Sequence, residues 1–174
     1  SVTTIYDAAF ANCTKLLVSE LPCSLKYLGA SAFSSCKAIT ISKLPATLTS
    51  LGTNVFNSSS ITSMDMSETS LTSLPQGFFE SATSLQTVIL PPALQTIENY
   101  AFQYCSSLSS IDLPETVTGI GYYTFNACTA LQTINFPANL EEIDQYAFRN
   151  TGLTEVTLPE NLTTLGSYAF LNST

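Results

Sequence analysis

Apolar residues recur along this chain at fixed positions of a unit of about 23 residues, and mostly polar residues separate them. One copy of the unit carries its marked residues in this order: Leu90-Pro91, Leu94, Ile97, Ala101-Phe102, Cys105, Leu108, Ile111 and Leu113-Pro114. A single coil of this length cannot bury its own apolar side, so neighbouring coils must stack to form a continuous core. The pattern therefore predicts a solenoid.

Phenylalanine is the most regular member of the unit. Successive phenylalanines are separated by 23 residues six times and by 22 residues once. The eight residues of this phenylalanine column are Phe10, Phe33, Phe56, Phe79, Phe102, Phe125, Phe148 and Phe170. We expect their side chains to lie above one another, one per coil.

The strand of each coil is expected in the segment Leu-x-x-Ile-x-Leu-Pro, for example from Leu108 to Pro114. Its last two apolar residues, Ile111 and Leu113, alternate with outward positions, as in a half-buried strand. Proline then ends the pairing because it has no N–H to donate. Strands that recur once per coil should pair in parallel, about 4.8 Å apart.

The repeated motif LPxxLxxIxxxAFxxCxxLxxIxLP resembles the BspA-like leucine-rich repeat over nearly the whole chain. The resemblance implies a β-rich right-handed superhelix, with one short parallel strand per repeat and turns or short 3-10 segments on the convex side. It also implies a cell-surface or secreted protein that adheres to host matrix proteins or to other cells.

We expect one domain over residues 1–174, with about seven to eight repeats and no internal boundary. The chain opens and stops within a repeat, and neither end resembles the polar cap that a solenoid needs. It is therefore interpreted as a fragment without its caps. Exposed coil ends would also favour end-to-end self-association. No apolar run approaches the ~20 residues of a membrane span, so membrane insertion is not expected.

Three repeats depart from the pattern. The first two carry Ser19 and Ser42 where Ile111 stands, and the apolar residues Val18 and Ile41 come one position earlier. A one-residue shift turns side chains to the opposite face, which predicts a local register change; otherwise this pair forms an exposed apolar patch. The third repeat, 61–74, lacks the Leu-Pro pair, is one residue short before residue 61, and regains that residue before residue 71.

Positions between the inward strand residues should point to solvent and form a candidate ligand surface. They carry mostly hydroxyl and amide side chains, which suit a protein or glycan partner but are equally typical of solvated strands. We call these twelve residues the polar face: Gln86, Thr87, Ile89, Ser109, Ser110, Asp112, Gln132, Thr133, Asn135, Thr154, Glu155 and Thr157.

Tyrosine forms a second aromatic column, two residues before phenylalanine in the later repeats. Four rings about 4.8 Å apart can stack and cover the backbone, or they can offer an aromatic platform to sugars or a partner protein. The tyrosine column comprises Tyr100, Tyr123, Tyr146 and Tyr168.

Cysteine recurs three residues after phenylalanine. Neighbours one coil apart satisfy the Cα separation of about 4.4–6.8 Å for a disulfide, but their parallel Cβ directions favour free thiols. Cys23 lies outside this column and leaves an odd count, which in a secreted protein indicates a free thiol or a bond between chains. The cysteine column contains Cys13, Cys36, Cys105 and Cys128.

The sequence offers little for catalysis or cofactor binding. It has no histidine, which excludes a Ser-His-Asp or Cys-His arrangement, and no CxxC pair or glycine-rich phosphate loop. The carboxylates of 141–144 are interpreted as solvated, and a glycosidase is only a weak alternative. We expect no enzyme activity, no cofactor and no metal. Four Asn-x-Ser/Thr sequons are no enrichment over chance and matter only for a eukaryotic source: Asn12, Asn57, Asn161 and Asn172.

Charge is divided along the chain. Residues 1–43 carry +4 − 2 = +2, and residues 44–174 carry +1 − 11 = −10, giving the total of −8. Such an acidic body should repel nucleic acid. The sequence thus favours a non-enzymatic adhesion or binding module that recognises a host or partner protein, extracellular matrix included, or a glycan. The alternative is a structural spacer or self-assembling repeat segment.

Overall fold

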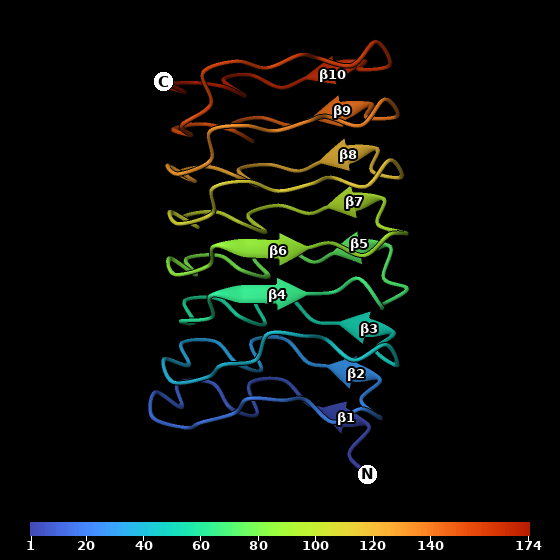
Figure 1. Cartoon of the computed structure of the whole chain (residues 1–174), viewed down its shortest axis with the longest axis vertical. Helices are drawn as coiled ribbons and strands as arrows, with labels where there is room; N and C mark the ends of the chain where they lie inside the picture. Colours follow the sequence, from blue (N-terminus) through green and yellow to red (C-terminus); the bar gives the residue numbers. More distant parts are fainter.

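The computed structural model describes all 174 residues as a stack of coils wound about one axis, with the two termini at opposite ends (Figure 1). The chain has ten short strands and no helix. Every strand pair is parallel, and turns connect the strands within each coil. The prediction of a β-rich leucine-rich-repeat solenoid is confirmed.

The most regular ladder consists of one two-residue strand per coil. These strands form two sheets, in the orders β1-β2-β3 and β5-β7-β8-β9-β10. The second residue of a strand usually points inward, as Ile97 and Ile143 do. The eight strands are β1 (Thr4–Ile5), β2 (Tyr27–Leu28), β3 (Ser50–Leu51), β5 (Ser73–Leu74), β7 (Thr96–Ile97), β8 (Gly119–Ile120), β9 (Glu142–Ile143) and β10 (Thr164–Leu165).

This ladder is interrupted between β3 and β5. In the other coils, the residue after the strand donates its N–H to the last strand residue of the preceding coil, as Gly52 does to Leu28 at 2.8 Å. Pro75 occupies this position after β5 and has no N–H to donate. A hollow of about 350 Å³ lies between the two strands. The N–H groups of Thr72 and Ser73 also make no bond to Thr49, although the equivalent bonds are present in the other coils, so the division into two sheets coincides with Pro75 but is not due to the proline alone.

The second ladder lies in the segment where the sequence predicted a strand in every coil. Here only β4 (Ser63–Asp65) and β6 (Thr87–Ile89) pair over three residues. Isolated bridges join Lys43 to Asp65 and Asp112 to Asn135. The regular strand therefore precedes the phenylalanine, and the expected position was only partly right. Alternation of apolar residues fixes the face that a side chain takes, but not whether neighbouring backbones come within hydrogen-bonding distance.

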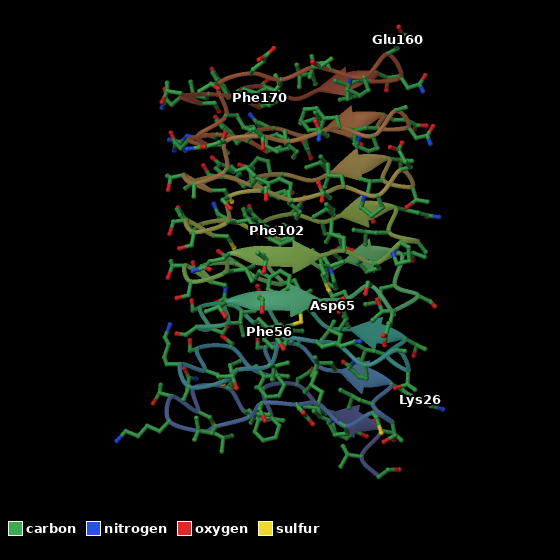
Figure 2. The ribbon with its side chains drawn as sticks, viewed as in Figure 1. Lys26, Phe56, Asp65, Phe102, Glu160 and Phe170 are labelled. Atoms are coloured by element: carbon green, nitrogen blue, oxygen red, sulfur yellow. The ribbon has the colours of Figure 1, made fainter.

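The phenylalanine column forms the centre of the core. Neighbouring rings are nearly parallel, with centroids 5.0–6.0 Å apart, and Phe102 and Phe125 stack at 5.1 Å with an interplanar angle of 4°. The six internal rings are fully buried, and Figure 2 marks Phe56, Phe102 and Phe170 along the stack. Phe78, beside the column, fits by packing edge-on against Phe79 at 4.6 Å.

Two residues with left-handed backbone flank every phenylalanine of the column, one two positions before it and one two positions after it. Around Phe125 these are Tyr123 (φ 55°) and Ala127 (φ 60°). The N–H groups of all three residues donate to carbonyls of the following coil. Fifteen of the sixteen such residues are not glycine, although this conformation costs other residues about 1–2 kcal/mol each. The hydrogen bonds between coils hold them there.

The irregular repeats behave largely as their sequences predict. Ile41 is buried and Ser42 is exposed, so the register change is confirmed at this coil and the exposed apolar pair is wrong. In the third repeat, the paired residues Lys43, Asp65 and Ile89 are separated by steps of 65 − 43 = 22 and 89 − 65 = 24, which shows the lost and regained residue.

A side-chain turn replaces the missing Leu-Pro pair of the third repeat. The Asp65 carboxylate accepts hydrogen bonds from the Ser67 N–H at 2.9 Å and the Ser67 hydroxyl at 2.7 Å. These two bonds lower the pKa of Asp65 below its usual value. Lys43 forms an ion pair with Glu68 at 2.7 Å, and this contact raises the pKa of the lysine.

Candidate functional site

The polar face is exposed as its sequence pattern predicts. All twelve of its residues are solvent-exposed, whereas the intervening residues Val88, Ile111 and Ile134 are buried. Ile89 is its one large apolar member, with 55% of its surface exposed. The structure therefore brings these residues onto one side of the solenoid, the side that carries β4 and β6 in Figure 1.

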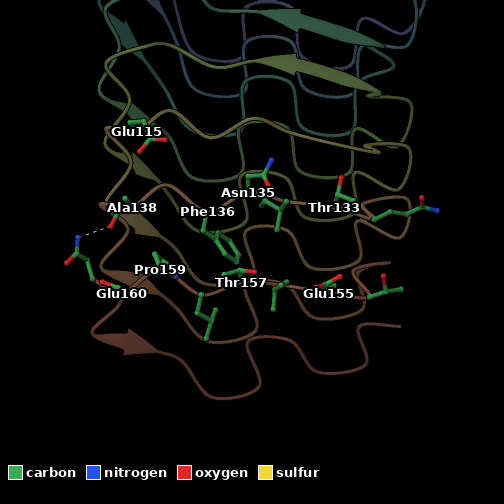
Figure 3. Close-up of a pocket in the computed structure, with 15 residues that line it drawn as sticks. Glu115, Thr133, Asn135, Phe136, Ala138, Glu155, Thr157, Pro159 and Glu160 are labelled. Atoms are coloured by element: carbon green, nitrogen blue, oxygen red, sulfur yellow. Dashed lines mark hydrogen bonds between the residues drawn. The ribbon is translucent and has the colours of Figure 1, made fainter.

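A groove opens on the C-terminal half of the polar face. It has a volume of about 800 Å³ and is lined by residues of the segments 132–138 and 154–161, together with Glu115 (Figure 3). Its lining includes three exposed carboxylates, Glu115, Glu155 and Glu160, and no lysine or arginine. No feature of the sequence had indicated a groove at this place. Six members of the polar face line it: Gln132, Thr133, Asn135, Thr154, Glu155 and Thr157.

The tyrosine column is a stack whose rings cover one another. Successive centroids from Tyr100 to Tyr168 lie 5.9, 4.7 and 5.2 Å apart, with interplanar angles of 10–29°. Ring faces inside the column therefore lie against neighbouring rings, and Tyr100, Tyr123 and Tyr146 are half-buried. This geometry favours the structural interpretation over a flat platform for sugars.

Two further side chains join the tyrosine column. Tyr122 stands almost perpendicular to it, 4.3 Å from Tyr123 between ring centroids. Desolvation raises the pKa of Tyr122, and a hydrogen bond to Tyr123 adds to this effect. The guanidinium carbon of Arg149, the one basic residue of the acidic half, lies 5.7 Å from the centroid of Tyr146. Sequence periodicity identified the column but neither of these neighbours.

The cysteine column consists of free thiols in this structure. Three thiols donate hydrogen bonds to phenylalanine carbonyls of the preceding coil: Cys36 to Phe10 at 3.0 Å, Cys105 to Phe79 at 3.2 Å and Cys128 to Phe102 at 3.1 Å. Burial raises the pKa of all three thiols.

Residues other than cysteine stand at the same position of the repeat in other coils, and their hydrogen bonds differ. Thr151 stands three residues after Phe148, at the position that follows Cys128 in the stack, and donates to the Phe148 carbonyl at 3.0 Å. Ser59, at the same position in the third coil, is buried and its hydroxyl has no partner. Cys23 lies outside the column and is exposed.

The four sequon asparagines differ in their surroundings. Three of them use their side-chain amide as a donor, as Asn57 does to Glu80 at 3.1 Å, Asn161 to the Ala138 carbonyl at 2.8 Å, and Asn172 to Asn150 at 3.2 Å. Asn12 is exposed and its side chain makes no hydrogen bond.

The structure places no group of three or more histidine, cysteine, aspartate or glutamate side chains where they could hold a metal ion. The carboxylates of Glu142 and Asp144 instead border a shallow hollow of about 180 Å³ beside β8, together with Glu98. The structure also contains no helix with the length and apolarity that a membrane crossing requires.

The stacked coils, the short parallel strands and the phenylalanine column define a leucine-rich-repeat solenoid. The chain belongs to the BspA type leucine-rich repeat family, whose model matches residues 3–121 and 60–174. A comparison with curated proteins gives no match.

Several solved bacterial structures are similar to this chain. A leucine-rich repeat protein from Bacteroides ovatus is 31% identical, with a TM-score of 0.85 over 97% of this chain and 44% of its own. The pneumococcal vaccine antigen PcpA is 25% identical, with a TM-score of 0.57 over 99% of this chain and 52% of its own. A leucine rich cell surface protein from Faecalibacterium prausnitzii, 24% identical, shares the fold with a TM-score of 0.53 over 99% of this chain and 62% of its own. This chain thus spans about half the length of these proteins.

Proposed function

We propose that this chain is a non-enzymatic binding or adhesion module of a cell-surface or secreted protein. Its partner would be a protein, such as an extracellular matrix component, or a glycan. The observation that carries the proposal is the polar face, where twelve exposed residues stand in rows over a continuous core of 42 buried residues. Repeat proteins commonly use such extended rigid surfaces for recognition.

The chemistry of the polar face fits recognition better than catalysis. Hydroxyl and amide groups donate and accept hydrogen bonds but hold no proton that titrates near neutral pH. Because short strand residues are already ordered by the core, a partner would lose little additional conformational freedom when it binds. Membership of a family whose solved relatives include a cell surface protein and a vaccine antigen supports a location at the surface or outside the cell.

A binding screen against purified matrix proteins and a glycan array tests the proposal. We expect at least one ligand whose affinity falls about tenfold or more when Thr87, Ser110 and Thr133 are replaced together by arginine. Replacing Tyr123 and Tyr146 by serine provides the comparison on the opposite side of the coil. Loss of binding only in the tyrosine variant would move the site to the tyrosine column.

No binding in either screen by a folded sample would contradict the proposal and favour the spacer or self-assembling alternative. Light scattering over a range of concentrations then distinguishes those two, since only self-assembly raises the apparent mass.

A further inference from the structure

The groove separates two extended segments that belong to neighbouring coils and are held together on both sides of it. On the convex side, the Ala127 N–H donates to the Arg149 carbonyl at 2.8 Å. At the Leu-Pro turn, the Asn161 side-chain amide donates to the Ala138 carbonyl at 2.8 Å, the dashed contact in Figure 3. Between these contacts, no hydrogen bond joins residues 132–137 to residues 153–159.

The same position of the repeat is closed between β4 and β6, whereas the next pair of segments, 86–90 and 109–113, is not joined by hydrogen bonds and has no groove of this size between its members. The strands β4 and β6 pair over three residues, from Ser63 with Thr87 to Asp65 with Ile89. The groove is therefore a place where a parallel ladder can form but two coils of this chain do not form it. Unpaired N–H and C=O groups of extended segments are the groups that a further strand recognises.

A local change in the repeat accompanies this opening. The step between equivalent residues Asn135 and Thr157 is 157 − 135 = 22, one residue less than the usual period. Gly152 lies in the shortened turn, where an added Cβ would stand only 2.7 Å from the Thr129 carbonyl oxygen. The turn is thus pressed against the preceding coil, while the segment that follows it does not pair with its neighbour.

The negative charge around the groove favours extended ligands that carry positive charge. Glu115, Glu155 and Glu160 are all exposed at its lining, and no basic side chain is present to neutralise them. Rim charges of one sign steer partners of the opposite sign and reject partners of the same sign. Its volume of about 800 Å³ lies within the range of ligand sites, roughly 300–1,000 Å³.

We propose that this groove binds an extended, lysine- or arginine-bearing segment of a partner protein, whose backbone pairs with the segments 132–136 and 154–158. This inference rests on the proposed binding function and specifies its partner as a polypeptide. Backbone pairing would supply affinity, and the three carboxylates would select basic side chains at alternate positions of the ligand.

The test uses a blocked octapeptide of alternating threonine and lysine, labelled for fluorescence anisotropy. We expect saturable binding to this chain and an affinity about tenfold lower for the variant E115Q/E155Q/E160Q. The matched control, E20Q/E141Q/E142Q, removes three exposed carboxylates outside the groove and should change affinity by less than about twofold. Equal losses in both variants would indicate non-specific attraction to an acidic surface and overturn the proposal.

Two further measurements report on backbone pairing. Methylation of alternate peptide nitrogens removes, without changing charge, the donors that face one of the two segments, so each of the two alternations should weaken binding. In hydrogen exchange, the amides of 154–158 should become protected when the peptide binds. Binding that survives both methylated peptides, or the absence of binding at about 1 mM peptide, contradicts the inference.

The experiments distinguish failure of the groove proposal from failure of the proposed binding function. If the peptide does not bind but a matrix protein or glycan does, and substitution of Thr87 and Ser110, which lie outside the groove, abolishes that binding, the module is a binder whose site is not the groove. If no ligand of any kind binds, both proposals fail.

Discussion

The thiol of Cys128 donates a hydrogen bond to the carbonyl oxygen of Phe102 across 3.1 Å, from one coil to the coil before it. The same carbonyl accepts the N–H of Cys105 at 3.0 Å. Each thiol therefore satisfies the second lone pair of a buried carbonyl between coils. A disulfide would remove this donor, because neither sulfur would then carry a hydrogen.

The two buried thiols should make stability depend on alkaline pH. Burial raises the pKa of Cys105 and Cys128 above the ordinary value of 9.0, so folded thiols stay protonated while unfolded thiols ionise. The unfolded state then binds fewer protons, and the free energy of unfolding should be constant below about pH 9 and fall above it. The limiting slope is about 1.4 kcal/mol per pH unit for each thiol.

Urea unfolding at pH 7 to 10 measures this slope. The double variant C105A/C128A is the control, and Ala82 already occupies the same position of another coil. It should lose the part of the slope that the two thiols supply. An unchanged slope would show that other groups carry the alkaline transition.

Thiol labelling should distinguish the five cysteines by exposure. Cys23 is exposed and should react with a soluble disulfide reagent within minutes at pH 8, whereas Cys36, Cys105 and Cys128 are buried and should react only when the solenoid opens. Mass spectrometry after brief labelling identifies the modified residue. Rapid modification of Cys105 or Cys128 in folded protein would contradict the buried column.

Removal of one ring should open the phenylalanine column. Phe125 is fully buried between Phe102 and Phe148, each about 5.1 Å away between centroids, so F125A should lower the free energy of unfolding by about 3–5 kcal/mol. The exposed substitution T133A should change it by less than about 0.5 kcal/mol. Chemical denaturation measures both, and similar values would argue against a stacked core.

Replacement of a left-handed residue by glycine should raise the free energy of unfolding, whereas removal of a stacked ring lowers it. Ala127 has φ 60° and its N–H is bonded to Arg149, so A127G should relieve backbone strain without losing that bond. Greater freedom of the unfolded chain offsets part of the gain, and we expect a net stabilisation of about 0.5–1 kcal/mol. Ala130 lies in a nearby turn without a positive φ, and A130G should instead destabilise the protein. Destabilisation by A127G would show that its methyl group contributes more through packing than the strain costs.

The polar face could be predicted because alternation in a strand has a period of two residues. Val88 and Ile111 identify the inward side, and their neighbours Thr87 and Asp112 must therefore face out. The same reasoning identified the register change at Ile41, since an apolar residue displaced by one position needs a displaced backbone to remain buried. The polar face and the register change both depend on which positions along the chain are apolar, and these positions can be read directly from the sequence.

The ladders could not be assigned in the same way. The strand at Thr96–Ile97 is too short to produce a clear alternation, and the longer alternation at Ile111 and Leu113 belongs to a segment that pairs only through an isolated bridge. The break after Leu51 involves two losses in the next coil: Pro75 has no N–H to donate, and the N–H groups of Thr72 and Ser73 do not bond to Thr49. The groove likewise depends on the separation of two coils, although each of its lining segments matches the repeat.

Sequence alone determined the repeat length, the identity of the stacked residues and the faces that they occupy, because these follow from the spacing of apolar side chains along one coil. Tertiary structure decided which backbones pair, where the ladders are interrupted and how the tyrosine rings shield one another. These properties depend on distances between atoms of different coils, which the spacing of residues along one coil does not record.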